Sequence, residues 1–217
     1  MPLAIFDLDD TLIDGDCASL WCRHMANLQW ADGESFLARE SELMELYAEG
    51  KLAMEDYMAF TLTPLVGRTA EEVEYEVGPF VEDVIEPLIH SDAMRRVAAH
   101  RAAGDRVLVI SASARFLVSA IAGRLGIDEV LAIELDERHG SFSGDTLGVL
   151  TYREGKITRL RAWLEGQGES LDGASFYSDS HNDLPLLRLV DRPHAVNPDP
   201  QLRRHAEEAG WPILEWR

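Results

Sequence analysis

The sequence predicts an α/β fold, in which helices flank a parallel sheet and an α-helical segment is inserted after the first strand. The apolar run Leu3–Phe6 is typical of a buried strand. Between Thr11 and about Glu86 no segment has the period of a strand, whereas apolar residues recur at helical spacing. After Pro87 helical and strand patterns alternate, and this rhythm indicates a parallel sheet covered by helices.

The helical insert divides into four segments. Their apolar stripes are Trp21, Met25 and Leu28; Phe36, Leu43, Met44, Leu46 and Tyr47; Tyr57, Phe60 and Leu62; and Val73 and Val77. We expect Thr69 to cap the fourth helix, because Glu72 three residues later completes a capping box. Stripes of methionine and aromatic residues usually form core, so the insert is predicted to have a small core of its own.

The remaining elements follow Pro87 in order. We expect helices at 93–103 and 116–125, strands at 106–110, 130–135 and 175–178, and a helix that starts at Lys156. Residues 140–152 alternate well enough to predict a β-hairpin, with its turn at Gly144 and Asp145. The stretch from Ala195 to Leu214 predicts one more strand, an amphipathic helix and a last strand.

Polar residues follow three of the predicted strands, at 7–11, at 111–113 and at Asp179. The carboxyl ends of parallel strands meet at one edge of a sheet, which is the usual place of an α/β active site. Asp7 and Asp9 would face the same way on an extended backbone. Their repulsion is tolerated when a divalent cation or a lysine lies between them. A solvated acidic turn after an edge strand is the alternative.

The order of four motifs is more informative than any one of them. Asp7-Leu8-Asp9-Asp10-Thr11, a hydrophobic strand that ends at Ser111, Lys156 at the start of a helix, and Asp179-Ser180-His181-Asn182-Asp183 follow one another along the chain. This set resembles the haloacid dehalogenase superfamily of phosphohydrolases, in the branch of phosphoserine phosphatase-like and histidinol-phosphatase-like enzymes (subfamily IB). The resemblance covers nearly the whole chain. It implies a Rossmann-like core of residues 1–14 and 87–217 and a helical cap domain of residues 15–86 over the active site.

The resemblance also implies a role for each motif residue. Asp7 would be the nucleophile that forms an aspartyl-phosphate, and Asp9 the general acid and base. Mg²⁺ would be held by the carboxylates of Asp7 and Asp179 and by the backbone carbonyl of Asp9. The residues expected around the phosphate or substrate are Asp10, Asp16, Ser111, Ala112, Lys156 and Asn182, with Lys156 neutralising Asp7 and the transferring group. Asp183, together with Asn182, is expected to orient Lys156 and metal-bound water.

Each of these roles has a simpler alternative. Lys156 could be a solvated lysine in a first helical turn, although a cation at a helix N-terminus is unfavourable without another reason to be there. Ser111 could be a helix N-cap alone, but capping and phosphate binding use the same N–H groups. Asp183 could cap the helix that carries Leu184.

The substrate is predicted from one acidic residue and one missing arginine. In phosphoserine phosphatases an acidic residue after the nucleophile motif receives the substrate ammonium, and Asp16 stands near that place. A cap arginine receives the carboxylate, but the comparable stretch here, residues 60–64, has none, and Arg68 lies several residues later. A phosphorylated amino alcohol fits this pattern, so we expect histidinol phosphate, with phosphoserine as the alternative. The alternatives of other classes are a receiver-like signalling module without turnover, a phosphotransferase, and a degenerate binding protein that no longer hydrolyses the intermediate.

Composition restricts the partners. The chain has 217 residues, 46% of them hydrophobic, which is enough for a sizeable core. It carries 20 basic and 39 acidic side chains, a formal net charge of −19, which disfavours nucleic acid and anionic membranes as partners. A small phosphorylated metabolite is the expected partner, and the sequence gives no indication of an oligomeric state.

The cysteines and the N-terminus predict a reducing compartment. Cys17 and Cys22 are the only cysteines, and their spacing suggests no zinc site. The first predicted strand begins within three residues of the N-terminus, without a basic region or a long apolar stretch before it. A cytoplasmic location is therefore expected.

Overall fold

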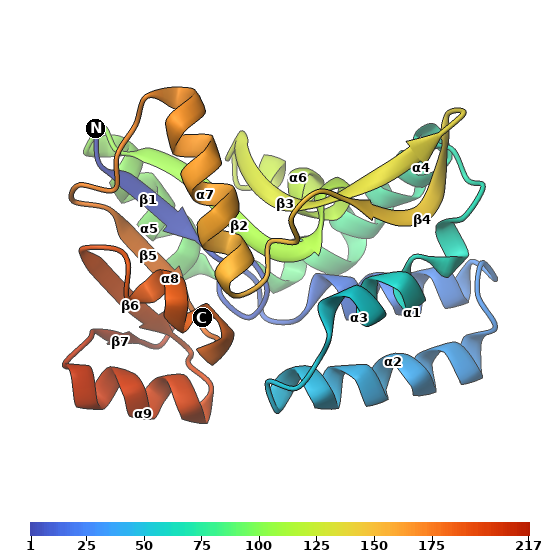
Figure 1. Ribbon diagram of the computed structural model, residues 1–217, viewed down its shortest axis with the longest axis horizontal. Helices are drawn as coiled ribbons and strands as arrows, with labels where there is room; N and C mark the ends of the chain where they lie inside the picture. The colour runs from blue at the N-terminus through green and yellow to red at the C-terminus, as the bar shows by residue number, and fades with distance from the viewer.

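A seven-stranded sheet forms the centre of the computed structural model, which describes all 217 residues (Figure 1). The strand order is β4-β3-β2-β1-β5-β6-β7, and every neighbouring pair is parallel except β3 and β4. The strands are β1 Leu3–Phe6, β2 Arg106–Ala114, β3 Glu129–Arg138, β4 Ser141–Leu147, β5 Ser175–Ser178, β6 Arg192–Val196 and β7 Ile213–Leu214. The first strand therefore lies in the middle of the sheet, between β2 and β5.

Helices cover both faces of the sheet, as the alternating strand and helix patterns predict. They are α5 Ser91–Ala102, α6 Arg115–Arg124, α7 Glu154–Gln167, α8 Leu184–Leu187 and α9 Pro200–Ala209. Ile5, Leu108 and Phe176 pack on one face with apolar side chains of α7, α8 and α9. Phe6 and Val109 belong to the opposite face, which α5 and α6 cover. Successive strand residues point to opposite faces, so both sides of these short strands are buried.

Four α-helices lie between β1 and α5 in the sequence: α1 Cys17–Asn27, α2 Gly33–Ala48, α3 Met54–Thr61 and α4 Ala70–Phe80. Figure 1 shows α1, α2 and α3 beyond the carboxyl ends of the central strands. The expected capping box is present, since the Thr69 hydroxyl accepts from the Glu72 backbone N–H at 3.1 Å and the Glu72 carboxylate accepts from the Thr69 backbone N–H at 2.8 Å.

The helical insert does not have a separate core. Its buried side chains join one continuous apolar cluster with one face of the sheet. Trp21 shows the connection, because its ring lies 5.1 Å from the ring of Phe80 and 5.7 Å from that of Phe116 on α6. The expectation of an independent small core was wrong because helical periodicity shows which face of a helix is buried but not what covers it.

Two local predictions also differ from the structure. The hairpin is formed by β3 and β4, which pair from Arg138 and Ser141 outward, and not by two strands within residues 140–152. Its turn is at His139 and Gly140, both of which have positive φ. The second strand, β2, continues to Ala114, so residues 111–113 belong to a strand and α6 starts only at Arg115.

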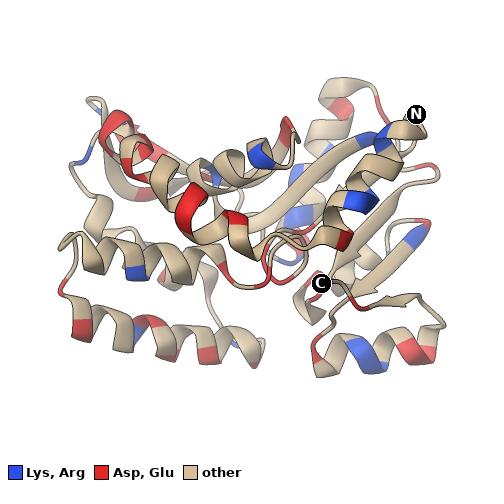
Figure 2. Ribbon diagram, turned by 180° about the vertical axis from the view of Figure 1, so that it is seen from behind, with Lys and Arg blue, Asp and Glu red and all other residues tan.

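The charge is spread over the surface. Figure 2 shows acidic residues on many of the helices and on β3, with several on α4, whose first turns contain Glu71, Glu72, Glu74 and Glu76. None of the helices has the length and apolar character needed to cross a membrane.

Candidate active site

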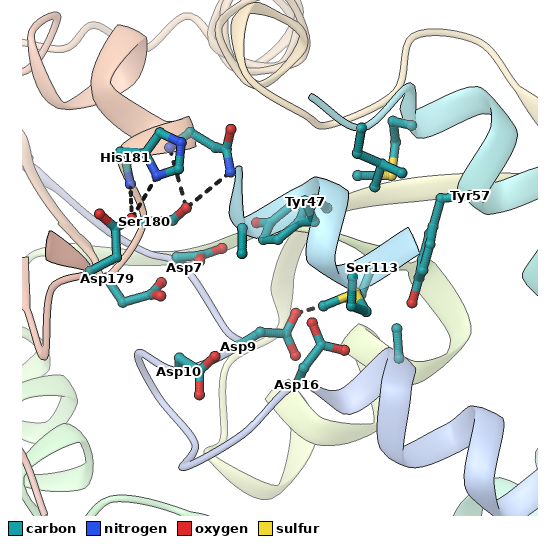
Figure 3. Close-up of a pocket in the computed structure, with 18 of the residues that line it drawn as sticks. Asp7, Asp9, Asp10, Asp16, Tyr47, Tyr57, Ser113, Asp179, Ser180 and His181 are labelled. Atoms are coloured by element: carbon teal, nitrogen blue, oxygen red, sulfur yellow. Dashed lines mark hydrogen bonds and ion pairs between the residues drawn. The ribbon is translucent and has the colours of Figure 1, made fainter. Parts of the chain in front are cut away.

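The polar residues at the carboxyl ends of β1, β2 and β5 lie together, as expected. They line a cavity of about 440 Å³ between the sheet edge and the inserted helices (Figure 3). The predicted site residues on its wall are Asp7, Asp9, Asp10, Asp16, Ala112, Lys156, Asp179 and Asn182. Ser111 and Asp183 are buried behind this wall.

Lys156 holds two carboxylates from different segments, Asp7 directly after β1 and Asp183 in the turn after β5. Its Nζ donates to Asp7 Oδ1 and to Asp183 Oδ2, each at 2.8 Å, and all three side chains are buried. Ser178 donates to the same oxygen of Asp183 at 2.7 Å. The backbone before Lys156 needs a glycine, because a Cβ on Gly155 would lie 1.9 Å from the carbonyl oxygen of Leu150.

Electrostatics explains why these three groups occur together. Burial raises the pKa of Asp7 to about 7, against the lowering effect of Lys156 and with further raising by Asp183 and Asp9. Burial alone would lower the pKa of Lys156, but the charges of Asp183 and Asp7 raise it above the usual value. The amine therefore stays charged, and it is the cation that makes ionised Asp7 tolerable inside the protein.

Asp9 is oriented by three donors. Its Oδ1 accepts from the backbone N–H of Cys17 at 2.7 Å, at the start of α1. Its Oδ2 accepts from the hydroxyls of Ser113 at 2.9 Å and Ser111 at 3.3 Å, both on β2. These bonds fix the carboxylate at the junction between the sheet edge and the first inserted helix.

Asp179 and its neighbours fit a hard cation. Thr11 Oγ1 donates to Asp179 Oδ1 at 3.2 Å and accepts from the Asp179 backbone N–H at 3.0 Å. Burial, with the charges of Asp7 and Asp10, raises the pKa of Asp179 well above its usual range. No group of three or more His, Cys, Asp and Glu side chains is arranged as a metal site. The predicted ligands are two carboxylates and one backbone carbonyl, and such oxygens suit Mg²⁺.

The serine segment is placed differently from the expectation. Ser111 is not at a helix N-terminus, because Ala114 stands directly before α6. Its hydroxyl accepts from the backbone N–H of Ser113 at 3.0 Å and lies behind the cavity wall. Ser113, which the sequence analysis did not select, lines the cavity and bonds Asp9. Alternation along an extended strand could have identified it, since it lies two residues after Ser111.

Asn182 makes no hydrogen bond with Lys156, contrary to the expectation. Its Oδ1 accepts from Arg153 Nε at 3.0 Å and from the Tyr152 hydroxyl at 3.1 Å, and its Nδ2 donates to Ser180 Oγ at 3.3 Å. Arg153 and Tyr152 carried no motif signal in the sequence. Only the fold brings the segment before α7 against the loop after β5.

The inserted helices line the other side of the cavity. Asp16 is the N-cap of α1, where its Oδ1 accepts from the Ser19 backbone N–H at 2.7 Å. Burial and the charge of Asp9 raise its pKa well above the usual range. Tyr47 and Tyr57 also line the cavity, although their spacing predicted only core. Lys156 is the only lysine or arginine on the wall.

Arg68 does not reach this cavity. Its guanidinium lies 3.8 Å from the centre of the Trp30 ring, and its Nε donates to the carbonyl of Pro64 at 3.0 Å. The ring and the carbonyl account for the position of this arginine away from the site.

Comparison with known proteins identifies the family. The family model described as haloacid dehalogenase-like hydrolase matches residues 4–188. The chain belongs to this family. A histidinol-phosphatase from Neisseria meningitidis is 37% identical over 219 residues, which cover 99% of each chain. A phosphoserine phosphatase of Mycobacterium tuberculosis is 30% identical over 217 residues, 99% of this chain and 70% of the relative.

Solved structures agree with this assignment. A protein of unknown function from Bordetella pertussis has a TM-score of 0.91 at 36% identity, with 98% of this chain and 97% of the other covered. A substrate-bound phosphoserine phosphatase has a TM-score of 0.73 at 20% identity, over 98% and 92% of the two chains, which shows a shared fold. Together with the phosphatases among its relatives, family membership makes the protein a phosphoric monoester hydrolase.

Replacement of Lys156 by methionine tests the buried ion pairs. We expect the free energy of unfolding to fall by about 3–5 kcal/mol, because Asp7 and Asp183 stay buried without their cation. Urea denaturation in EDTA at pH 8 measures the change. Lys51→Met is the matched control, since Lys51 is exposed and pairs only with Glu49 at the surface. Equal unfolding midpoints for the Lys156→Met variant and the wild type would contradict the role of this ion pair.

Proposed function

We propose that this protein is a Mg²⁺-dependent phosphomonoesterase that hydrolyses a small phosphorylated metabolite, histidinol phosphate, through an aspartyl-phosphate. The observation that carries the proposal is the placement of Asp7 at the cavity wall, bonded to a buried lysine at 2.8 Å. A carboxylate attacks an anionic phosphate ester only when nearby positive charge offsets the repulsion.

The first half of the proposed reaction uses Asp7 and Asp9. A carboxylate oxygen of Asp7 forms a bond to phosphorus while the bond from phosphorus to the ester oxygen breaks. Asp9, protonated at this stage, gives its proton to the leaving oxygen, which departs as an alcohol. Lys156 stays charged beside Asp7 and offsets the negative charge that collects around the phosphoryl group.

The second half of the reaction regenerates the Asp7 carboxylate and the protonated form of Asp9. Asp9, now ionised, takes a proton from water, and the water oxygen attacks the phosphorus of the aspartyl-phosphate. The bond between phosphorus and Asp7 breaks, which releases inorganic phosphate and leaves Asp9 protonated again. The serine hydroxyls and the Cys17 N–H that bond Asp9 hold it in place for both steps. A Mg²⁺ ion held by Asp7, Asp179 and the Asp9 carbonyl would supply Lewis-acid stabilisation of the phosphoryl oxygens.

In this proposal the chain has two domains, a core of residues 1–14 and 87–217 and a cap of residues 15–86. The cap would close over the substrate and exclude water from the cavity. The proposal also includes a location in the cytoplasm and a role in amino-acid biosynthesis, for which the free cysteines Cys17 and Cys22 and the named relatives give support.

The cap side of the cavity supports a cationic substrate. Asp16 presents a carboxylate there, of which only one oxygen is used in the helix cap. A substrate ammonium would pair with it, whereas a substrate carboxylate would meet no arginine, since Arg68 lies on Trp30. Histidinol phosphate carries an ammonium and no carboxylate, and the relative from Neisseria meningitidis is a histidinol-phosphatase. Phosphoserine is the second candidate because a relative at 30% identity is a phosphoserine phosphatase.

A panel of phosphorylated metabolites, assayed for phosphate release with and without Mg²⁺, tests the proposal as a whole. Release that depends on Mg²⁺ is expected, with histidinol phosphate as the best substrate. A protein that becomes phosphorylated without releasing phosphate would instead be a signalling module, and transfer to an acceptor other than water would indicate a phosphotransferase.

Asp7→Asn should abolish turnover without unfolding the protein. The replacement is nearly isosteric, removes the nucleophile and relieves repulsion with neighbouring carboxylates, so thermal stability should hold or rise. Phosphate release and thermal denaturation measure the two effects. Retention of more than a few per cent of wild-type activity would exclude Asp7 as the nucleophile.

Chelation should remove the activity. We expect EDTA to stop phosphate release, added Mg²⁺ to restore it, and excess Ca²⁺ to inhibit it, because Ca²⁺ prefers more ligands and a looser geometry than Mg²⁺. A titration of each ion against initial rate makes the measurement. Full activity after exhaustive chelation would contradict the metal dependence.

Substrate preference should follow the charge of the cavity wall. We expect kcat/KM to be roughly thirty- to a thousand-fold higher for histidinol phosphate than for phosphoserine. The carboxylate of phosphoserine would be buried without a partner, which costs about 2–4 kcal/mol of transition-state stabilisation. Asp16→Asn should narrow this preference and leave p-nitrophenyl phosphate hydrolysis little changed. If phosphoserine is the better substrate, the substrate proposal is wrong, while the phosphatase assignment stands.

A further inference from the structure

Arg153 connects three parts of the protein that the sequence keeps far apart. It stands directly before α7, with the positive φ of 50° that non-glycine residues rarely adopt. Its Nε donates to Asn182 Oδ1 at 3.0 Å, in the loop after β5. Its Nη2 donates to the carbonyl of Gly50, in the loop between α2 and α3.

The bonds to Asn182 decide which way its amide points. Arg153 Nε and the Tyr152 hydroxyl both donate to the same end of the amide, so that end must be the oxygen. The NH₂ end is then directed to the opposite side, toward Ser180, where one hydrogen bonds Ser180 Oγ at 3.3 Å. Asn182 and Ser180 both line the cavity. The amide therefore presents a donor to the cavity, which is the polarity that a phosphate oxygen requires.

The loop at Gly50 fits closely around the same guanidinium. A Cβ at this position would lie 3.0 Å from Arg153 Nη2 and 3.0 Å from His181 Nε2. The φ of Gly50 is 67°, so a side chain would also strain the backbone. Next to this contact, the rings of Tyr47 on α2 and Tyr152 lie 5.8 Å apart. The end of α2 and the loop at Gly50 thus pack against Arg153 and Tyr152.

We propose that Arg153 is a positioning residue for the phosphatase reaction: it fixes the Asn182 amide with its donor end toward the cavity and anchors the insert loop at Gly50 with the same guanidinium. The Arg153 side chain thereby couples the position of the loop at Gly50 to the orientation of the Asn182 amide. This inference rests on the proposed function only for the part played by Asn182 at the phosphate.

A double-mutant cycle tests the action through Asn182. Arg153→Met should lower kcat/KM for p-nitrophenyl phosphate roughly ten- to a hundred-fold, as expected for the loss of a charge-assisted hydrogen bond to a site residue. In an Asn182→Ala background the same change should have a clearly smaller effect on kcat/KM, since the group that Arg153 positions is gone and only the loss of its contact to Gly50 remains. Losses that multiply fully in the double variant would overturn the action through Asn182. Arg159→Met is the matched control, because Arg159 lies on α7 and bonds Glu134 away from the cavity.

Limited proteolysis tests the anchoring of the insert without any assay of turnover. Lys51 follows Gly50 and is exposed, so trypsin cleavage after Lys51 reports release of this loop. Arg153→Met and Gly50→Ala should both speed this cleavage several-fold, whereas Arg159→Met should not. Arg153→Lys, which keeps the charge but not the fork of donors, should restore part of the protection and little of the activity. Unchanged cleavage in both variants would overturn the anchoring.

The two tests separate this inference from the proposed function. If the wild type releases no phosphate from any ester, the proposed function fails, and the proteolysis still decides whether Arg153 holds the loop. If turnover is normal and Arg153→Met behaves like Arg159→Met in both experiments, only the role of Arg153 fails.

Discussion

The site depends on one buried ammonium group. Lys156 bridges Asp7 and Asp183 at 2.8 Å, and the exposed fractions of the three side chains are 3%, 9% and 3%. A buried ion pair costs free energy when it is formed from water, so an arrangement of this kind contributes specificity of placement more than stability. It joins the carboxyl end of β1, the start of α7 and the turn after β5. The elements must be in register for the three charges to meet.

The same charge arrangement resolves the conflict between an acidic protein and an anionic substrate. The formal net charge is −19, and most of the cavity wall is acidic or neutral. A phosphate ester would be repelled by this surface at long range. Lys156, hydrogen-bond donors on the wall and a bound Mg²⁺ would reverse the sign over a few ångströms, where the phosphoryl group lies. The side of the cavity that contains Asp16 would then attract the cationic end of an amino alcohol phosphate. One end of the cavity would favour an anionic group of the substrate and the other end a cationic group.

The insert and the core share their packing as well as the cavity. Trp21 and its neighbours belong to the same apolar cluster as one face of the sheet. Movement of the whole insert would therefore expose apolar surface, which is unfavourable. The loop at Gly50 adds a polar contact to Arg153, while Leu52 and Met54 next to it belong to the same apolar cluster.

Features that depend on local pattern could be predicted from the order of the residues alone. The strands Leu3–Phe6 and Ser175–Ser178, the capping box at Thr69 and the clustering of strand ends at one edge all follow from periodicity, capping chemistry and the geometry of parallel sheets. The motif order was enough to predict the family and to select Asp7, Lys156 and Asp179 as neighbours. Local pattern was misleading at residues 140–152, because alternation shows that a segment is extended but not which strand it pairs with.

Contacts between segments that are distant in sequence could not be predicted, because they depend on how the whole chain packs. Asn182 was expected beside Lys156 but is bonded by Arg153 and Tyr152, and Arg68 is held by Trp30 away from the cavity. Ser113 faces Asp9 because β2 continues beyond Ile110. The physical reason is the same in each case. A side chain binds whichever partner the packing of the whole chain brings within about 3 Å, and a pattern of neighbouring residues contains no information on that distance.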